Sequence, residues 1–563
     1  MAINGETLPR GQHLLSVTIN TTIDRIASAR LVFQDGSASA GGFNFSSGES
    51  MVPGNKIEIK AGAQNDPQIL FSGIITRHSS KVRNNSAPQL IVEAKHHAIK
   101  MTIHKKSRVF FDGTDSDAIS TLFSDAGVAL ESEATHITHP QLVQYQCSDW
   151  HFSLARARLN SKHLLTRPDG IVLQGINPEG ESKADLVFGA TVLEADLQLE
   201  SRQQFTGVNA KIWDSANQEL IEQEGSDPGL TTPGNLTGSD LANALDNNQR
   251  ILKHPQLSQD EASQWANASW QESQANRVQG RIKCEGIGSL QVGDLVTLAG
   301  FSDRFNGTAF ITGVRHQHDT VQGWKTDLQF GGIEPLECLI PPMSEPPASA
   351  VIPAIHGLHI AIVTSNEDPQ AEHRVRVKLA QIDSDDEGTW ARVACLDAGN
   401  ERGTFFRPEV GDEVIVGFIN DDPRAAVILG MLNSSAKPAP LTGSDDNHEK
   451  VIQTRSKMKW LLNDEKVEMS LATPAGNKLQ LSEEQKAIVL EDQHGNSITL
   501  NEEGITLSSA KAIKFDATAD LELNAQQAIT IKAGTELKLE GGVSAEISSA
   551  AQTTVKGGIV QIN

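Results

Sequence analysis

Two pairs of histidines have a spacing that occurs in metal sites. The pairs are His136-Ile137-Thr138-His139 and His356-Gly357-Leu358-His359. A zinc protease of the HExxH type needs a glutamate between its histidines, and a zinc finger needs a CxxC pair close by. Neither histidine pair has such a neighbour. The sequence therefore predicts no metal-ligating residue at either position.

An acidic stretch begins like a calcium loop. Asp383-Ser384-Asp385-Asp386-Glu387-Gly388 places acids at positions one, three and five and glycine at position six, as an EF-hand loop does. Position twelve is Ala394, where an EF-hand needs glutamate, and strand-like segments flank the loop in place of helices. We therefore expect a solvated loop between two strands.

Motifs for catalysis and for nucleotide binding are also missing. No GxSxG nucleophile, Walker A loop or GxGxxG turn occurs in a usable context. The four cysteines lie far apart and form no CxxC pair, so Cys147, Cys284, Cys338 and Cys395 are expected to be reduced thiols in the core. The sequence thus predicts no catalytic residue, no cofactor and no enzyme.

Size and charge narrow the class of protein. The 563 residues give room for three or four domains. The chain has 48 Lys and Arg against 71 Asp and Glu, a net charge of −23, and an acidic surface repels phosphate backbones, so no nucleic-acid partner is expected. No run of eighteen apolar residues occurs, and the start Met1-Ala2-Ile3-Asn4-Gly5-Glu6 lacks the features of a signal peptide. We expect the chain to be made and assembled in the cytoplasm.

The stretch from Ile505 to Asn563 carries the most regular pattern in the chain. Triplets with mostly apolar outer residues recur every eight residues and are centred on Thr506, Lys514, Glu522, Thr530, Lys538, Glu546 and Thr554. The alternation within each triplet predicts a short strand with one buried face, and the small and polar residues between triplets predict corners. A fixed short period is typical of stacked repeat units.

One such octad is too short to enclose a core by itself. Eight residues extend about 26 Å at roughly 3.3 Å each. Three chains that contribute one face each to every layer would close a prism and remove the free sheet edges. We therefore predict an intertwined trimeric β-helix with a core of Ile505, Leu507, Ile513, Phe515, Leu521, Leu523, Ile529, Ile531, Leu537, Leu539, Ile547 and Val555. A flat solvated sheet and a single-chain β-solenoid remain alternatives.

The middle residues of the octads are expected to lie on the outer surface. They run Thr, Lys, Glu, Thr, Lys, Glu, Thr, so opposite charges lie one octad apart and could pair along the shaft. Exposed pairs of this kind contribute about 0–1 kcal/mol each. They favour solubility and register more than stability.

The sequence before the octads indicates a series of β-rich domains. Alternating apolar residues between turn signals predict many short strands. The predicted order is a β-rich domain at 1–110, helices and strands at 111–220, a polar insertion at 221–257, a second β-rich domain at 258–340, a proline-rich linker at 341–350, a five-stranded OB-type barrel at 351–432, a linker at 433–449 and the octad-bearing region at 450–563.

Three helices are expected among these strands. The first runs from a cap at Asp115 to Phe123, and the second follows Ser148 from Trp150 to about Leu165. The third begins with a capping box, in which Ser258 is the cap and Glu261 lies three residues on, and it extends to roughly Arg277.

Three stretches resemble VgrG-type spike proteins, in which a phage tail hub is fused to a needle. One is Phe406 to Phe418 with Asp422-Pro423-Arg424 and Val427-Ile428-Leu429-Gly430, which is similar to their OB-barrel signature. Another is Val292-Gly293-Asp294, Gly307 to His316 and Gly323-Trp324-Lys325-Thr326, which is similar to their hub. The octads, which end in Val555-Lys556-Gly557-Gly558-Ile559-Val560-Gln561-Ile562-Asn563, are similar to their needle.

The resemblance implies a mainly β homotrimer. Its hub would consist of two β-barrel-like domains with a few helices, its neck of the OB barrel and its shaft of the β-helix. An inner tube protein and other baseplate proteins would bind the hub, and a PAAR-type tip protein would dock on Gly557, Gly558, Ile559, Val560, Gln561, Ile562 and Asn563. The final triplet, centred on Gln561, follows Thr554 after seven residues.

The implied function is the central spike of a bacterial contractile injection system, which nucleates the inner tube and contacts the target membrane only during puncture. The compact chain favours an extracellular phage-tail-like particle, with a type VI secretion spike as the alternative. A tail fibre and an envelope-degrading spike are rival interpretations, but the gap from Asn433 to His448 is too short for an enzyme domain.

Overall fold

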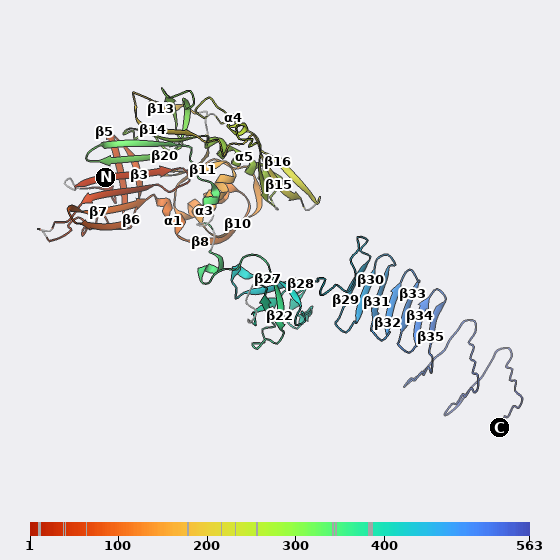
Figure 1. Ribbon diagram of the computed structural model, residues 1–563. Helices are drawn as coiled ribbons and strands as arrows, with labels where there is room; N and C mark the ends of the chain where they lie inside the picture. The colour runs from red at the N-terminus through yellow and green to blue at the C-terminus, as the bar shows by residue number, and fades with distance from the viewer. Residues whose placement is uncertain are drawn as a thin grey trace. The chain divides into compact units, whose positions relative to one another are not determined.

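The computed structural model describes residues 1–563 except 9–12, 38, 40, 64, 177–179, 215–216, 231, 255–256, 340–342, 344–345, 381–386 and 563. The chain forms two compact units. The first consists of Met1–His359, Ser365–Thr404 and Val416–Leu429, and the second of Ile360–Thr364, Phe405–Ile415 and Gly430–Asn563. Strands dominate both units, as the alternating sequence predicts (Figure 1).

A sheet of thirteen strands runs through the first unit, and Figure 1 shows β5, β3, β20 and β14 within it. Its strands are β1 (Ala2–Ile3), β2 (Glu6–Thr7), β3 (Leu14–Thr22), β4 (Ser28–Gln34), β5 (Lys56–Ala63), β6 (Asp66–Arg83), β7 (Ser86–Lys95), β13 (Ser182–Val187), β14 (Val192–Leu199), β18 (Val278–Glu285), β19 (Leu295–Ala299), β20 (Gly307–Asp319) and β21 (Gly323–Phe330). The antiparallel pair β3–β20 joins the N-terminal strands to those that follow residue 278.

Two separate hydrophobic cores lie within the first unit. One contains Leu31, Phe33, Phe71 and Leu90 from the N-terminal strands. The other contains Ile282, Ile311, Leu328 and Phe330 from the later strands. Both cores lie against strands of the same sheet, so the two halves share one backbone ladder.

Five α-helices are described: α1 (Lys100–Ile103), α2 (Asp115–Ala126), α3 (Asp149–Leu159), α4 (Gly238–Asn243) and α5 (Gln259–Ala275). The capping box at Ser258 and Glu261 is confirmed. The prediction for α3 was wrong at its end, because Ser161 has φ +56, which stops the helix, and Leu164 and Leu165 reach the core from a strand. Short 3₁₀ turns are η1 (His97–Ile99), η2 (Leu336–Leu339), η3 (Pro347–Ala350) and η4 (Ile419–Asp421).

Smaller sheets complete the first unit. They consist of β8 (Lys105–Thr114) with β10 (Thr138–Ser148); β9 (Leu130–Ser132), β11 (Lys162–Arg167) and β12 (Gly170–Gly175); and β15 (Val208–Asp214), β16 (Glu219–Glu224) and β17 (Arg250–His254). The last of these corrects the polar insertion at 221–257. That region supplies strands and a helix, and its Leu230, Ala242 and Leu252 are buried.

Five strands close into a barrel, as the sequence predicts for 351–432. They are β22 (His359–Ser365), β23 (Val375–Leu379), β24 (Thr389–Val393), β27 (Glu413–Phe418) and β28 (Ala426–Met431), in the order β22-β23-β24-β28-β27. A two-stranded hairpin, β25 (Ala398–Gly399) and β26 (Arg402–Gly403), extends from it. Residues 381–386 of the acidic loop lie outside the described residues, but β23 and β24 on either side are strands, as expected.

The second unit contains an antiparallel meander of seven strands. These are β29 (Glu449–Gln453), β30 (Lys459–Asn463), β31 (Glu468–Ala472), β32 (Lys478–Ser482), β33 (Ala487–Glu491), β34 (Ser497–Asn501) and β35 (Gly504–Ser508). Of the predicted octad triplets, only Ile505-Thr506-Leu507 lies in a strand. The other triplets are not strands here because a ladder needs a partner, and within one chain the described residues 509–562 have none.

No helix within the described part of the chain is both long and apolar enough to cross a lipid bilayer.

Candidate functional site: an unpaired apolar surface

The seven-stranded meander carries an apolar face that its own chain leaves uncovered. Its register aligns two columns of side chains on that face. One column is Ile452, Trp460, Leu471, Leu479, Leu490, Ile498 and Leu507, and the other is Leu462, Met469, Leu481, Ile488, Leu500 and Ile505. A trough of about 860 Å³ follows the second column. Most of these side chains are exposed, for example Leu490 at 50%.

The opposite face of the meander has a different composition. Successive residues of a strand point to opposite faces, so the middle residues form one column between the two apolar ones. That column is Val451, Leu461, Ser470, Gln480, Val489, Thr499 and Thr506. The alternation that the sequence predicts is therefore present, with the more apolar face left open.

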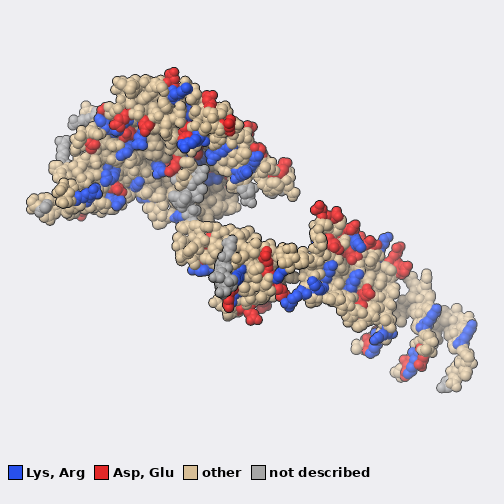
Figure 2. Space-filling model, viewed as in Figure 1, with Lys and Arg blue, Asp and Glu red and all other residues tan. Residues whose placement is uncertain are grey.

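The octad region continues this open surface. All twelve residues that the sequence assigns to a trimer core are exposed, from Leu507 at 47% to Ile547 at 78%. Figure 1 draws the chain beyond β35 as a winding trace without a strand beside it, and Figure 2 shows its turns as separate arms. The predicted core residues therefore share one property, which is that their own chain does not bury them.

The backbone keeps the period of eight throughout. Paired bends occur at 510–511, 518–519, 526–527, 534–535, 542–543, 550–551 and 558–559. Between them the chain is extended, so the corners fall where the sequence predicts them. The last bend includes Gly558 and stays in register with the others.

The predicted docking end, residues 557–563, includes that bend and the residues after it. Ile559, Val560 and Ile562 are 86%, 50% and 91% exposed, and Asn563 lies outside the described residues. The period of eight continues through the bend, but Val560 and Ile562 are displaced by one residue from the apolar positions of the preceding octads. The end therefore offers an apolar surface that differs from the repeating shaft.

An apolar surface of this extent requires a partner. Soluble monomers rarely expose large contiguous apolar patches. Burial of one Leu or Ile side chain contributes about 1.5–3 kcal/mol, so burial of the two columns and of the ten octad residues beyond them is a large driving force for association.

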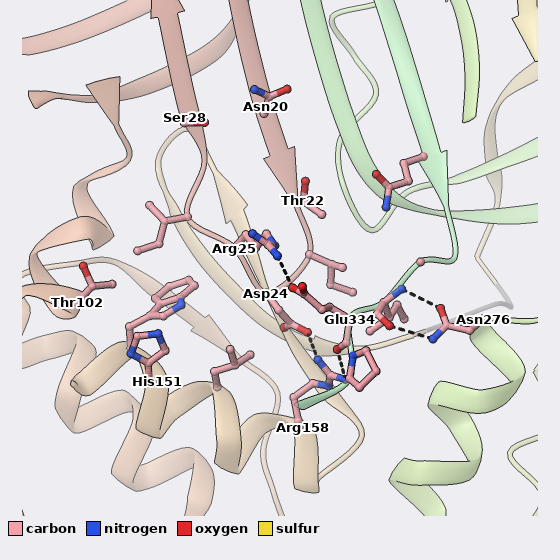
Figure 3. Close-up of a pocket in the computed structure, with 18 of the residues that line it drawn as sticks. Asn20, Thr22, Asp24, Arg25, Ser28, Thr102, His151, Arg158, Asn276 and Glu334 are labelled. Carbon is pink, nitrogen blue, oxygen red and sulfur yellow. Dashed lines mark hydrogen bonds and ion pairs between the residues drawn. The ribbon is translucent and has the colours of Figure 1, made fainter. Parts of the chain in front are cut away.

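The first unit contains a buried charged cluster beside a cavity of about 830 Å³, and Figure 3 labels Asp24, Arg158, Asn276 and Glu334 there. Arg158 Nη1 donates to Asp24 Oδ2 at 3.0 Å, Arg158 Nε donates to Glu272 Oε1 at 2.6 Å, and Arg158 Nη2 donates to the Glu334 carbonyl at 3.1 Å. His163 Nδ1 lies 2.8 Å from the same Asp24 oxygen.

The charges of this cluster stabilise one another. Burial alone would raise the pKa of Asp24, but His163 and Arg158 lower it below its usual value. Burial alone would likewise lower the pKa of Arg158, but Asp24 and Glu272 raise it. Every strong interaction of the cluster is internal, so its arrangement is that of a structural clasp.

The two histidine pairs lie in different surroundings. His139 is buried with its Nε2 3.1 Å from Asp115 Oδ2, whereas His136 is exposed. His356 Nδ1 lies 3.1 Å from Asp421 Oδ2, and His359 Nε2 lies 3.0 Å from the His356 carbonyl. In the described portion of the chain, no group of three or more His, Cys, Asp or Glu side chains is arranged to hold a metal.

The cysteines correct part of the sequence prediction. All four are free, and Cys147 and Cys284 are buried as expected. Cys338 and Cys395 are exposed, so the core placement was wrong for them. Cys338 lies just before the proline-rich linker and Cys395 just after β24, where the chain is at the surface of its unit.

Family comparisons cover most of the chain. Residues 1–319 match the Alg8 N-terminal domain. Residues 359–432 match the type VI secretion system/phage-baseplate injector OB domain, and residues 468–563 match the phage baseplate V C-terminal trimerisation domain. The last match includes most of the meander and all of the octads.

Individual relatives match shorter stretches. The chain is 32% identical over 120 residues to the type VI secretion system spike protein VgrG5 of Pseudomonas aeruginosa, which is 20% of this chain and 15% of that protein. It is 37% identical over 67 residues to the spike protein VgrG3 of Vibrio cholerae, which is 12% of this chain and 7% of that protein. The chain thus spans less than a sixth of the length of these relatives.

Solved structures with some likeness include a tail protein from Neisseria meningitidis. The TM-score is 0.45 at 14% identity, over 59% of this chain and 96% of that one. A Francisella PdpA–VgrG complex gives a TM-score of 0.37 at 11% identity, over 88% of this chain and 76% of that one.

Proposed function

The chain belongs to the Alg8 N-terminal-domain family and is a VgrG-type spike protein, and from this premise we propose that it is the homotrimeric central spike of a contractile injection system. Its hub nucleates the inner tube, and its β-helical needle punctures the target envelope. The apolar surface of residues 449–562 carries this proposal, because a single chain leaves it uncovered and residues 468–562 of it match the trimerisation domain.

The proposed role is mechanical. In a three-chain shaft the extended octads become hydrogen-bonded ladders around a continuous apolar core. Such a shaft resists bending because each layer is bonded to the next and the core is close-packed. Sheath contraction would drive this shaft through the target membrane, and the protein would contact lipid only during that step.

We assign the tip-docking role to residues 557–563. The exposed Ile559, Val560 and Ile562 support the role because they form an apolar end surface that departs from the octad pattern. A PAAR-type tip protein is the proposed occupant. A variant that lacks Gly557 to Asn563 should lose the tip protein in a pull-down, and retention of the tip protein would contradict the assignment.

The proposed spike has no enzymatic function. Strand β28 ends at Met431 and β29 begins at Glu449, an interval too short for an enzyme domain. We propose service in an extracellular phage-tail-like particle, with assembly in the cytoplasm before release. The alternative is a type VI secretion spike. Recovery of the protein in sedimentable cell-free particles would support the first system, and its retention in intact cells would support the second.

Two rival functions remain testable. A tail fibre would bind target cells as a purified protein, and an envelope-degrading spike would release soluble cell-wall fragments from isolated envelopes. The proposed mechanical spike should do neither. Either activity in the purified full chain would contradict the proposal.

The decisive experiment is the solution mass of the full chain beside a truncation that ends at Glu449, measured by light scattering. We expect a trimer for the full chain and a weaker or dissociated assembly for the truncation. A monomeric full chain would overturn the proposed function. A trimer in both proteins would show that contacts within the hub supply the free energy of assembly.

A further inference from the structure

The middle residues of the octads contain a second, longer repeat. Thr, Lys and Glu follow one another at Thr506, Lys514 and Glu522, and the same order returns at Thr530, Lys538 and Glu546. The charge pattern therefore repeats after every third octad. Three is also the number of chains in the trimer, and the two numbers are connected through the path of the backbone.

Neighbouring layers of the shaft must come from different protomers. Among the described residues from 509 to 562, no strand pairs with another segment of the same chain. A bend follows every eight residues, so each octad covers one face of a three-sided shaft and the next octad moves to the adjacent face. After three octads the chain returns to its starting face, and the two intervening layers on that face belong to the other two protomers.

The order of charges on one face follows from this path. Thr506 of one protomer lies beside Lys514 of a second, which lies beside Glu522 of the third, and Thr530 of the first comes next. Adjacent strands are about 4.8 Å apart, so side chains on the same face of neighbouring layers are in contact. This inference rests on the trimeric shaft of the proposed function and extends it to particular residues.

We propose that Lys514 pairs with Glu522 of a neighbouring protomer and Lys538 with Glu546 of a neighbouring protomer, and that these ladders fix the axial register of the three chains. If one chain slips forward by one octad, its Glu522 lies beside Glu522 of the next protomer, which places like charges in contact. If it slips backward, the Lys–Glu contacts are lost. The apolar core alone distinguishes these registers poorly, because most octads contribute similar Ile and Leu residues.

Each lysine of the proposed ladder lies beside a carboxylate two residues on, on the same side of its extended chain. Lys514 is 81% exposed and lies 3.0 Å from Asp516, and Lys538 is 72% exposed and contacts Glu540. Figure 2 shows blue and red side by side on the arms of the octad region. An ammonium group has three donors, so each lysine can bind a carboxylate of its own chain and one of its neighbour.

A disulfide test separates contacts between chains from contacts within one chain. In the full chain with Cys338→Ser and Cys395→Ser, the pair Lys514→Cys and Glu522→Cys should oxidise to a covalent trimer on a non-reducing denaturing gel. Adjacent strands place the Cα atoms within the range of about 4.4–6.8 Å that a disulfide allows. The pair Lys538→Cys and Glu546→Cys tests the next turn of the shaft.

Matched controls make the outcome specific. Lys514→Cys with Thr530→Cys, two layers apart, should form no bond. Bonds confined to single chains, or no bond in a protein of trimeric mass, would overturn the register inference and leave the trimeric spike intact. A monomeric parent protein would contradict both the proposed function and this inference.

Charge exchange tests the role in register. Glu522→Lys with Glu546→Lys should raise the rate of trimer dissociation about tenfold or more in low salt, because each face then carries adjacent lysines. Adding Lys514→Glu and Lys538→Glu should restore the parent rate to within about threefold. High salt should shrink the difference, since it screens exposed charges. An unchanged rate in the first variant, or no recovery in the exchanged one, would overturn the inference.

Discussion

Arg158 is the residue on which the described hub depends most clearly. Its side chain is 2% exposed and joins the turn at Asp24, helix α5 through Glu272, and the backbone at Glu334. Removal of one partner from a buried ion pair leaves the other charge without compensation, which costs about 3–5 kcal/mol. The effect should therefore exceed that of an ordinary surface pair.

We expect Arg158→Met to lower the free energy of hub unfolding by about 3–5 kcal/mol, measured by urea denaturation of the full chain. The matched control is Arg25→Ala. Arg25 also pairs with Glu334, but the two side chains are 61% and 44% exposed, so the loss should be about 0–1 kcal/mol. Equal losses in the two variants would contradict the clasp.

Two buried histidines predict that acid weakens the hub. Burial lowers the pKa of His316 to about 4, and burial together with His97 lowers the pKa of His96 to about 4. The unfolded chain takes up these protons near pH 6.5, so between pH 6.5 and 4 the unfolded state binds more protons than the folded one. The free energy of unfolding should therefore fall as the pH is lowered through this window.

His316→Gln should reduce the slope of hub stability against pH in that window, measured as the unfolding midpoint at several pH values. Each histidine contributes at most about 1.4 kcal/mol per pH unit. The exposed His136→Gln serves as the control and should leave the slope unchanged. An unaltered slope in His316→Gln would show that other groups determine the acid sensitivity.

The meander β29–β35 shows how an element can be regular and still incomplete. Its ladder is satisfied within one chain, whereas its apolar columns are not. The double variant Leu490→Asp with Ile498→Asp should lower the association constant of the trimer by several orders of magnitude. Each substitution removes burial of an apolar side chain worth about 1.5–3 kcal/mol in every protomer. Light scattering over a dilution series would measure this.

Thr499→Asp is the control for that face, since Thr499 lies between the columns and points to the opposite side. The trimer fraction should change little. If both variants dissociate alike, the apolar columns are not the interface.

The sequence predicted elements where local signals are strong. The octad corners, the five barrel strands and the capping box at Ser258 depend on spacing within a few residues, and each is confirmed, whereas of the octad triplets only the first is a strand. The sheet β15–β16–β17 was not predicted, because β16 is rich in Glu and its sequence does not alternate as a strand would. The sheet also depends on a pairing between β15 and β17, which lie far apart in the sequence. The cluster around Arg158 was not predicted either, because only the tertiary fold brings its residues together. The docking end stays a prediction.

At the scale of the whole molecule, the hub and the octad region differ in how their amides are protected. The hub has its ladders within one chain, but the described residues 509–562 have no intrachain ladder. We expect hydrogen exchange to find slow amides in residues 509–562 only at concentrations where the trimer forms, whereas hub protection should not vary with concentration. Slow exchange of the octads in a monomer would contradict an interchain shaft.

The open winding of the octads has a consequence for synthesis on the ribosome. Chains emerge at about 5–20 residues per second and fold from the N-terminal side. The meander therefore leaves the ribosome before the octads do, and three meanders can meet while the octads are still being made. Their association then brings three shaft segments into one place, and the shaft can close layer by layer behind them. We expect that octads translated without the preceding meander would remain unfolded or aggregate, because nothing else holds three copies of them together.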